Sequence, residues 1–156
     1  MLWRRRVAPF VIPIIRGWFR LTRGLTLGVR GVVIDAEGRV LLLEHTYVHG
    51  WHLPGGGVEQ AEPAETALAR ELVEEAGIRL TDRPKLLSIH DHNARHRGDH
   101  VLVYLCKAWT TCAATSRGEI YRTGWFAPDA LPAETTPSTR ARIREALFSE
   151  SPDLFW

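Results

Sequence analysis

The sequence predicts an α+β domain in which helices cover a mixed β-sheet. Runs of β-branched and apolar residues alternate with amphipathic helical stretches, in the order strands, helix, strands, helix. A chain of 156 residues with 45% apolar and 24% charged residues is long enough for one domain with a substantial core. It is too short for two ordinary domains.

The composition excludes several functional classes. The formal net charge of +2 is too small to indicate a nucleic-acid-binding protein, so no stable nucleic-acid partner is expected. No apolar run approaches the roughly 18–20 residues of a membrane-spanning helix. The only cysteines, Cys106 and Cys112, are expected to be free thiols in a cytoplasmic protein.

Residues 1–25 are predicted to form a basic, amphipathic helical extension, and residues 26–156 the main domain. Between Ile14 and Leu25, three arginines share one helical face and apolar residues share the opposite face. Three roles fit this pattern. The helix packs on its own domain or on a second copy in a homodimer, lies on a membrane surface, or contacts substrate phosphates.

The first half of the domain is predicted to be mainly strands. Residues 26–35 form one strand, residues 36–38 a turn, and residues 40–45 the return strand of a hairpin. After a polar loop, a short strand at 51–54 leads into three consecutive glycines at 55–57.

The second half contains three more predicted strands, separated by polar loops, and a final helix. The strands are placed at 85–90, 100–109 and 120–126, with the main loops at 91–99 and 110–118. The helix is placed at 136–148, with Ser138 as N-cap and with Ile143, Ala146 and Leu147 facing inward.

The central helix, predicted from Pro63 to Ala76 and ended by Gly77, carries the strongest chemical signal. The carboxylates of Glu71, Glu74 and Glu75 project within a sector roughly 100° wide. At a separation of about 6 Å and an effective dielectric constant near 20, each pair repels by about 2–3 kcal/mol. A divalent cation would remove that repulsion.

Small and apolar residues of this helix lie beside the carboxylates. Ala64 and Ala67 share the acidic sector, where their small side chains are expected to leave open space above the carboxylates. The neighbouring sector can pack onto a core, and it consists of Leu68, Ala69, Leu72, Val73 and Ala76.

The three glycines before the helix do not form a common nucleotide-binding loop. Neither G-x-x-x-x-G-K-[ST] nor a G-x-G-x-x-G that opens a helix is present. Because glycine lets the backbone approach a ligand, carbonyl groups here could complete the oxygen shell of a cation. A ligand set of oxygen atoms favours Mg²⁺ or Mn²⁺ over zinc.

One segment of 23 residues, from Gly56 to Ile78, matches the Nudix box at every fixed position. The pattern is Gly-x5-Glu-x7-Arg-Glu-U-x-Glu-Glu-x-Gly-U, where U is apolar, and Arg70 begins its central run. The approach at 51–54 and the segment at 124–132 are also similar to this family. The chain therefore resembles MutT-like Nudix hydrolases from about Thr26 to its end.

The resemblance implies a Nudix α/β/α sandwich that hydrolyses a nucleoside diphosphate linked to another group, with Mg²⁺ or Mn²⁺ as cofactor. It also implies the roles of individual residues. Glu71 and Glu75 would be the principal metal ligands, Glu74 an assisting ligand, the Gly55 carbonyl a further ligand, Arg70 the group that orients the carboxylates, and Glu62 a tie between loop and helix.

The general base stays open between a glutamate of the helix and Glu119, which follows the loop at 110–118. The alternative interpretation of Glu119 is a solvated loop carboxylate without a role in the reaction. Glu59 is an outer metal ligand or a surface charge.

Several aromatic and basic residues outside the box have two interpretations. The histidines at 90, 92, 96 and 100 lack a cysteine or acidic residue at zinc-finger spacing, so a zinc site is not indicated. They are solvated loop residues, or one of them, or Arg95 or Arg97, contacts substrate. Tyr47 and Trp51 stack on a base or pack in the core.

The substrate is only partly indicated. Residues 93–96 carry neither the proline typical of ADP-ribose enzymes of the family nor the tyrosine typical of dinucleoside-polyphosphate enzymes. The Pro54-Gly55-Gly56 approach is nearer to MutT-like proteins, which favours a nucleoside triphosphate or a nucleoside-diphosphate sugar. The alternative function is a catalytically weak module that binds or senses nucleotides on the same fold.

Overall fold

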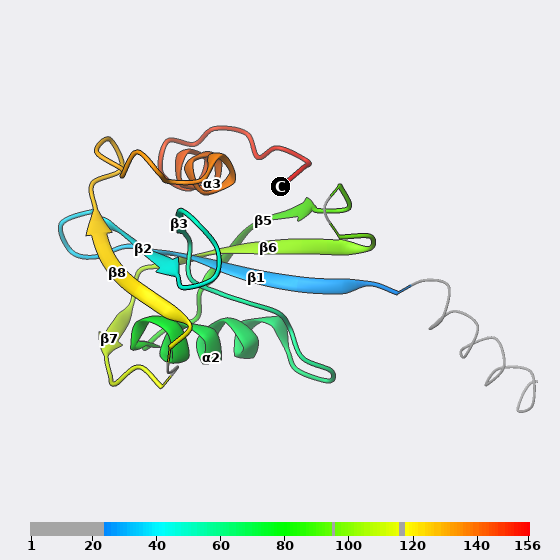
Figure 1. Cartoon of the computed structure of the whole chain (residues 1–156), viewed down its shortest axis with the longest axis horizontal. Helices are drawn as coiled ribbons and strands as arrows, with labels where there is room; N and C mark the ends of the chain where they lie inside the picture. The colour runs from blue at the N-terminus through cyan, green and yellow to red at the C-terminus, as the bar shows by residue number, and fades with distance from the viewer. Residues whose placement is uncertain (1–23, 95, 116–117) are drawn as a thin grey trace, which may run out of the picture.

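The computed structural model describes residues 24–94, 96–115 and 118–156 (Figure 1). Most of the helix predicted at 14–25 therefore lies outside the described residues. None of the helices in the described ranges is long and apolar enough to cross a membrane. In chain order the elements are β1 (Thr26–Val33), β2 (Val40–His45), β3 (Trp51–His52), α2 (Ala64–Ala76), β4 (Ile78–Leu80), β5 (Lys85–Asp91), β6 (Asp99–Cys106), β7 (Trp109–Thr111), β8 (Ile120–Phe126) and α3 (Pro137–Leu147).

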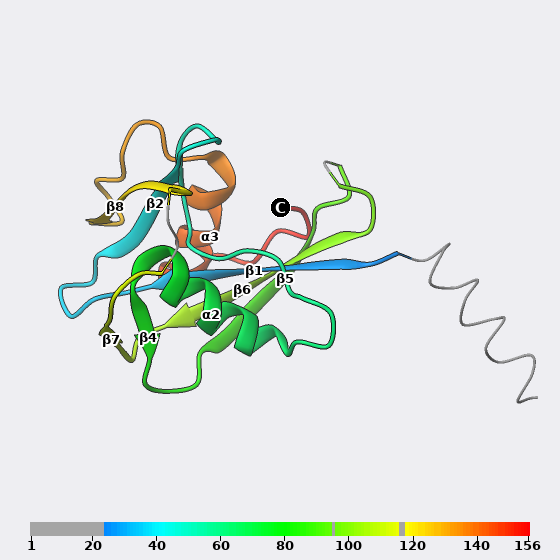
Figure 2. The same ribbon diagram turned by 60° about the horizontal axis from the view of Figure 1, so that its bottom comes forward.

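The strands form a central layer between the two helices. Strands β1, β6 and β5 make a mixed sheet, because β1 runs parallel to β6 and β5 runs antiparallel to it. Strands β3, β2 and β8 form an antiparallel sheet, and β4 pairs with β7. Helix α2 covers one side of these strands and α3 the other (Figures 1 and 2). The predicted α+β sandwich is confirmed, with its strands divided among separate sheets.

Each helix closes its own half of the core. Strand β1 alternates between the two halves, so Val29 packs with the buried residues of α2, whereas Val32 packs with Ile143 of α3. Leu68 and Leu72 anchor α2 and are fully buried. Ala67 is fully buried beside them, so the open space predicted above it is filled by the core.

The predicted hairpin between residues 26 and 45 is wrong beyond its turn. Asp35 and Arg39 close the turn, and a single bridge joins Ile34 to Val40. From there the strands separate, because β1 pairs along its whole length with β6 while β2 pairs with β8. The pairing of β1 and β2 is therefore decided by strands that are distant in the sequence, β6 and β8.

Two predicted boundaries also need correction. The strand predicted at 100–109 ends at Cys106, and Trp109–Thr111, partly assigned to a loop, pairs with β4. Helix α3 is capped by Thr136 and not by Ser138, because the Thr139 N–H donates to the Thr136 hydroxyl at 3.3 Å. Its inward face is as predicted, with Ile143 buried and Ala146 and Leu147 packed beside it.

Candidate metal-binding active site

The glycine segment lies along one edge of β1. The N–H groups of Val29 and Gly31 each donate at 2.9 Å to carbonyls of this segment, those of Gly56 and Pro54. The segment therefore occupies the edge of β1 that β6 leaves open and leads the chain from β3 to α2. Gly55 has φ +134°, and a Cβ there would collide with the Val29 carbonyl, so this position requires glycine.

The next glycine makes room for a carboxylate. A Cβ on Gly56 would lie 2.6 Å from Cδ of Glu71 and 2.8 Å from its Oε2. Glu71 can therefore lie against the loop only because residue 56 has no side chain. This explains in physical terms why the box begins with glycine.

Glu75 is the most buried of the site carboxylates, with 9% of its surface exposed. The Gly55 N–H donates to its Oε2 at 2.7 Å. Burial raises the pKa of Glu75 to about 7, and the negative charges of Glu71 and Glu119 add to the rise. The Gly55 hydrogen bond and Arg30 oppose this shift without cancelling it.

Arg30, which was not predicted, reaches the same loop from β1. Its Nη1 donates to the Gly55 carbonyl and, at 3.4 Å, to the Leu53 carbonyl. Burial lowers the pKa of Arg30, although Glu75 and Glu71 act in the opposite direction. The available signal was one arginine inside an otherwise apolar strand, Thr-Leu-Gly-Val-Arg-Gly-Val-Val.

Arg70 connects the loop to the acidic face of α2. Its guanidinium binds both oxygens of Glu62 at 3.1 Å, and Nη2 also donates to the Gly57 carbonyl. Its Nη1 donates to Glu71 at 2.8 Å and to Glu74 at 3.3 Å. These bonds, the one to Glu62 foremost, raise the pKa of Arg70 and lower that of Glu62. The carboxylates of Glu62, Glu71 and Glu74 thus all bind the guanidinium group of Arg70.

Glu119 and Tyr47 approach the site from two loops. The Thr46 N–H donates to the Glu119 carbonyl at 2.9 Å, which joins the loop after β2 to the start of β8. Partial desolvation raises the pKa of Tyr47, although most of its side chain is exposed, and the charges of Glu119 and Glu75 add to this rise. Glu59 is exposed, and its N–H donates to Glu62 at 3.0 Å.

The donor set suits a hard divalent cation, although the side chains are not arranged around one. Over residues 24–94, 96–115 and 118–156, no three acidic, histidine or cysteine side chains converge closely enough to hold a metal ion as they stand. Glu71 and Glu74 are bound to Arg70 instead. Carboxylate and carbonyl oxygens are the ligands that Mg²⁺ and Mn²⁺ prefer.

Trp51, Tyr47 and His90, for which the sequence allowed two interpretations, differ in burial. Trp51 packs, since it is 5% exposed and meets Phe126 edge to face at 4.8 Å between ring centroids. Tyr47 is exposed near the site. His90 is fully buried and bonded to Arg142 of α3, a role that the sequence did not indicate.

A cavity of about 930 Å³ adjoins the site on the α3 side of β1. Arg30 and Leu53 lie where it meets the glycine segment, and Tyr47 and His45 line it nearby. His92, His96, Trp156 and the first residues of α3 also line it. Burial and the charge of Arg30 lower the pKa of His45 to about 4, so this ring is neutral at pH 7.

Comparisons with known proteins agree on one family. The sequence profile of the NUDIX domain matches residues 24–147. A MutT-like protein of Streptomyces ambofaciens is 32% identical over 127 residues, which are 81% of this chain and 80% of that protein. The crystal structure of a MutT NUDIX hydrolase from Burkholderia pseudomallei, at 34% identity and a TM-score of 0.65, covers 76% of this chain and 95% of its own. An RNA pyrophosphohydrolase of Shewanella piezotolerans is 38% identical over 56 residues, or 36% of this chain and 32% of that protein.

Proposed function

This chain belongs to the Nudix family of hydrolases, and we propose that the carboxylates of α2 hold the divalent cation for its reaction. That reaction is the hydrolysis of a pyrophosphate bond in a nucleoside diphosphate linked to another group. The proposal rests on Glu75, a buried carboxylate whose pKa rises to about 7 beside Glu71 and Glu119. This excess of negative charge is what a divalent cation would neutralise.

Glu71 and Glu75 are the proposed principal ligands of Mg²⁺ or Mn²⁺, with Glu74 assisting. The Gly55 carbonyl is the proposed backbone ligand, because a carbonyl oxygen has two lone pairs and Arg30 uses one of them. When bound, the cation would neutralise the diphosphate and lower the pKa of a coordinated water.

Arg70 and Glu119 have different proposed roles. Arg70 orients Glu71 and Glu74, because its guanidinium binds both carboxylates and is itself fixed by Glu62. Glu119 is the proposed general base, since it comes from another loop and its charge acts on the buried Glu75.

The proposed substrate is a nucleoside triphosphate or a nucleoside-diphosphate sugar. The Pro54-Gly55-Gly56 approach supports this choice, and residues 93–96 carry no mark of the other subfamilies. The cavity of about 930 Å³ is large enough for a nucleoside or a sugar beyond the diphosphate. Arg30 lies where the cavity meets the glycine segment and offers a positive charge to phosphate oxygens.

The test is a turnover assay with Mg²⁺ or Mn²⁺ that follows loss of substrate by chromatography, on nucleoside triphosphates, nucleoside-diphosphate sugars, ADP-ribose and 5′-triphosphate RNA. Glu71→Gln and Glu75→Gln are each expected to lower kcat/KM on the best substrate by about 10²–10³-fold or more. Glu65→Gln is the matched control, because Glu65 lies on the same helix but pairs with the exposed Arg83. Identification of the products shows which bridging bond breaks.

The outcomes separate the alternatives. Wild-type turnover in both Glu71→Gln and Glu75→Gln would show that the site is wrongly assigned. Nucleotide binding without turnover of any substrate would favour the binding or sensing module. Glu119→Gln is expected to lower kcat while leaving the affinity for Mn²⁺ unchanged, and a loss of Mn²⁺ affinity would instead make Glu119 a ligand.

A further inference from the structure

A second group of charged side chains is buried on the opposite side of the sheet from α2. Arg142 of α3 donates from Nη1 to Nδ1 of His90 at 2.7 Å and from Nη2 to Glu145 at 2.6 Å. Since arginine has only donors, the Nδ1 of His90 must be the acceptor. The other ring nitrogen lies 2.6 Å from the Ser88 hydroxyl. No box residue takes part in this group.

This buried group fixes the segment 153–156 against the domain. Arg142 donates to the Phe155 carbonyl at 3.0 Å, and Glu145 accepts from the Asp153 N–H at 3.0 Å. The segment also pairs with the end of β5, because the Asp91 N–H donates to the Leu154 carbonyl at 2.8 Å and the Asp91 carbonyl accepts from the Trp156 N–H at 3.0 Å. Both ends of this short segment are therefore held by hydrogen bonds.

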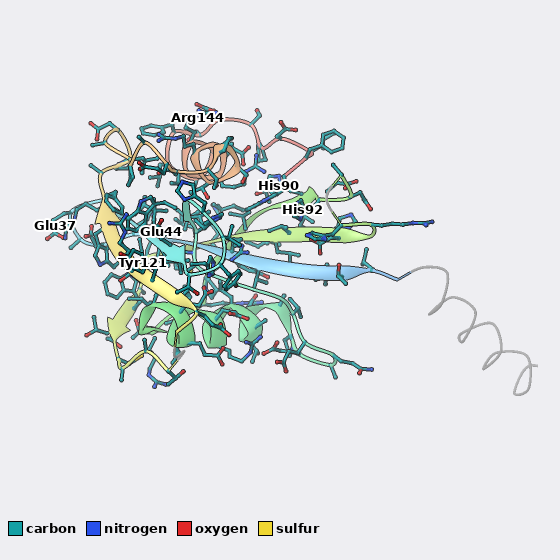
Figure 3. All side chains as sticks on the ribbon, viewed as in Figure 1. Glu37, Glu44, His90, His92, Tyr121 and Arg144 are labelled. Atoms are coloured by element: carbon teal, nitrogen blue, oxygen red, sulfur yellow. The ribbon has the colours of Figure 1, made fainter. Side chains whose placement is uncertain are left out.

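The anchored segment places the Trp156 ring in the wall of the cavity. Cζ of Arg142 lies 5.6 Å from the Trp156 ring centroid, and the His90 ring meets it edge on at 6.0 Å. His92, also in the cavity wall, lies 6.3 Å away between ring centroids. Figure 3 shows His90 and His92 at the end of β5, beside α3. Arg142 and His90 thus hold the Trp156 ring in place while it lines the cavity.

The cavity has an arginine at one end and aromatic rings along its wall, of which Tyr47 and His45 lie near Arg30. Arg30 lies where the cavity meets the glycine segment, and its charge suits phosphate oxygens. Trp156, His92 and His96 belong to other parts of the wall, formed by the segment 153–156 and by the loop between β5 and β6. A nucleotide with its diphosphate at the carboxylates and Arg30 would extend its nucleoside towards these rings.

We propose that Trp156 stacks on the base of the nucleotide substrate and thereby makes this chain favour substrates with a heteroaromatic base. This inference rests on the proposed function for the identity of the ligand. The segment 153–156 then acts as a specificity element, and Arg142 is a positioning residue that holds it.

The test compares a nucleoside triphosphate with its abasic counterpart, in which hydrogen replaces the base. Both compounds carry non-hydrolysable methylene bridges between their phosphates, so their Kd values can be measured by calorimetry with Mg²⁺ present and without turnover. Trp156→Leu, which keeps apolar packing, is expected to weaken binding of the nucleoside triphosphate about tenfold. Binding of the abasic compound is expected to change by less than about twofold, and Trp156→Phe is expected to restore the difference.

Phe155→Ala is the matched control. Phe155 is the neighbouring aromatic residue, but it is 63% exposed and does not line the cavity. Unchanged nucleotide binding in Phe155→Ala together with the loss in Trp156→Leu supports the inference. Equal effects of Trp156→Leu on both compounds, or no effect on either, would overturn it. Absence of turnover in the wild type would contradict the proposed function while leaving this binding result intact.

Discussion

Arg70 on α2 and Arg142 on α3 each form the centre of a network of carboxylates and backbone carbonyls, but they are buried to different degrees. The Arg70 side chain is 27% exposed, and its partners Glu62, Glu71 and Glu74 are 13%, 14% and 40% exposed. The Arg142 side chain is 2% exposed, and its partner Glu145 is 9% exposed.

The difference indicates what each network can do. Water and ions reach the Arg70 network, so its carboxylates can exchange contacts with the arginine for contacts with a cation or substrate. The Arg142 network lies in a low-dielectric interior, where an unpaired charge is costly, so it keeps its partners and fixes the structure around it. Similar chemistry would thus serve the proposed ligand binding on one helix and the proposed positioning on the other.

The largest expected effect is on stability, from Arg142→Met. The variant leaves Glu145 buried without its cation, so it is expected to lose about 3–5 kcal/mol of unfolding free energy and roughly 10 °C in Tm. Arg144→Met is the matched control, because Arg144 lies on the outer surface of the same helix in an exposed pair (Figure 3). Its change is expected to stay below about 1 kcal/mol. If urea unfolding gave equal curves for Arg142→Met and Arg144→Met, the Arg142 network would not be more important for stability than an exposed ion pair.

Arg70→Gln is expected to show the reverse balance. Its partners can be rehydrated, so the loss of unfolding free energy should be only about 1–2 kcal/mol. Because Arg70 orients proposed metal ligands, kcat/KM should fall by roughly 10–100-fold. Arg83→Gln is the control. Arg83 is an exposed residue that pairs with Glu65 of α2, and its replacement should leave kcat/KM unchanged. Steady-state kinetics that showed equal losses in both arginine variants would contradict the orienting role.

The two helices also differ in how they begin. Helix α2 follows Pro63 and has no side-chain cap, whereas Thr136 caps α3. Thr136→Ala is therefore expected to cost about 1 kcal/mol of unfolding free energy. Ser138→Ala, at the residue that the sequence suggested as the cap, should change it by less than about 0.5 kcal/mol. Thermal and urea unfolding of the two variants would reveal the cap, and a larger loss in Ser138→Ala would reverse the assignment.

A further expected effect is a change in the pH dependence of stability with divalent cations chelated. Burial raises the pKa of Glu75 from 4.5 to about 7. The folded state therefore retains a proton that the unfolded state loses, and the contribution of Glu75 to stability falls as pH rises through this range. Burial and Arg142 lower the pKa of His90 below 6.5, so its contribution falls as pH decreases below 6.5.

The two groups therefore act in opposite directions between pH 4.5 and 6.5. In this range, Glu75→Gln should make stability rise more steeply with pH, and His90→Gln should make the rise shallower. His45, whose pKa falls to about 4, acts in the same direction as His90 and remains in both variants. Urea unfolding at pH 5, 6 and 7 measures the slopes, and slopes unchanged in both variants would show that neither burial effect operates.

The sequence was most informative where structure and function are local. Helix α2 lies within one residue of its predicted start and ends at the predicted Gly77, which adopts φ 62° and donates to the Leu72 and Val73 carbonyls. Leu68 and Leu72 are buried as predicted. Periodicity and capping act within a few residues, so they can be read from a single stretch of chain. The spacing of the box identified the family for the same reason.

Only the tertiary structure decided which distant segments meet. Thr26 pairs with Asp99 across the sheet, and this pairing separates β1 from the strand that follows it in sequence. Arg30 meets the Gly55 carbonyl, and Arg142 meets His90, across separations of 25 and 52 residues. An arginine in a strand or helix is ordinarily predicted to face solvent, and only the burial of its partners changes that expectation. The sequence by itself determined the helix, its carboxylates and the family. The cavity and the position of Trp156 depend on contacts between distant residues, which no local pattern records.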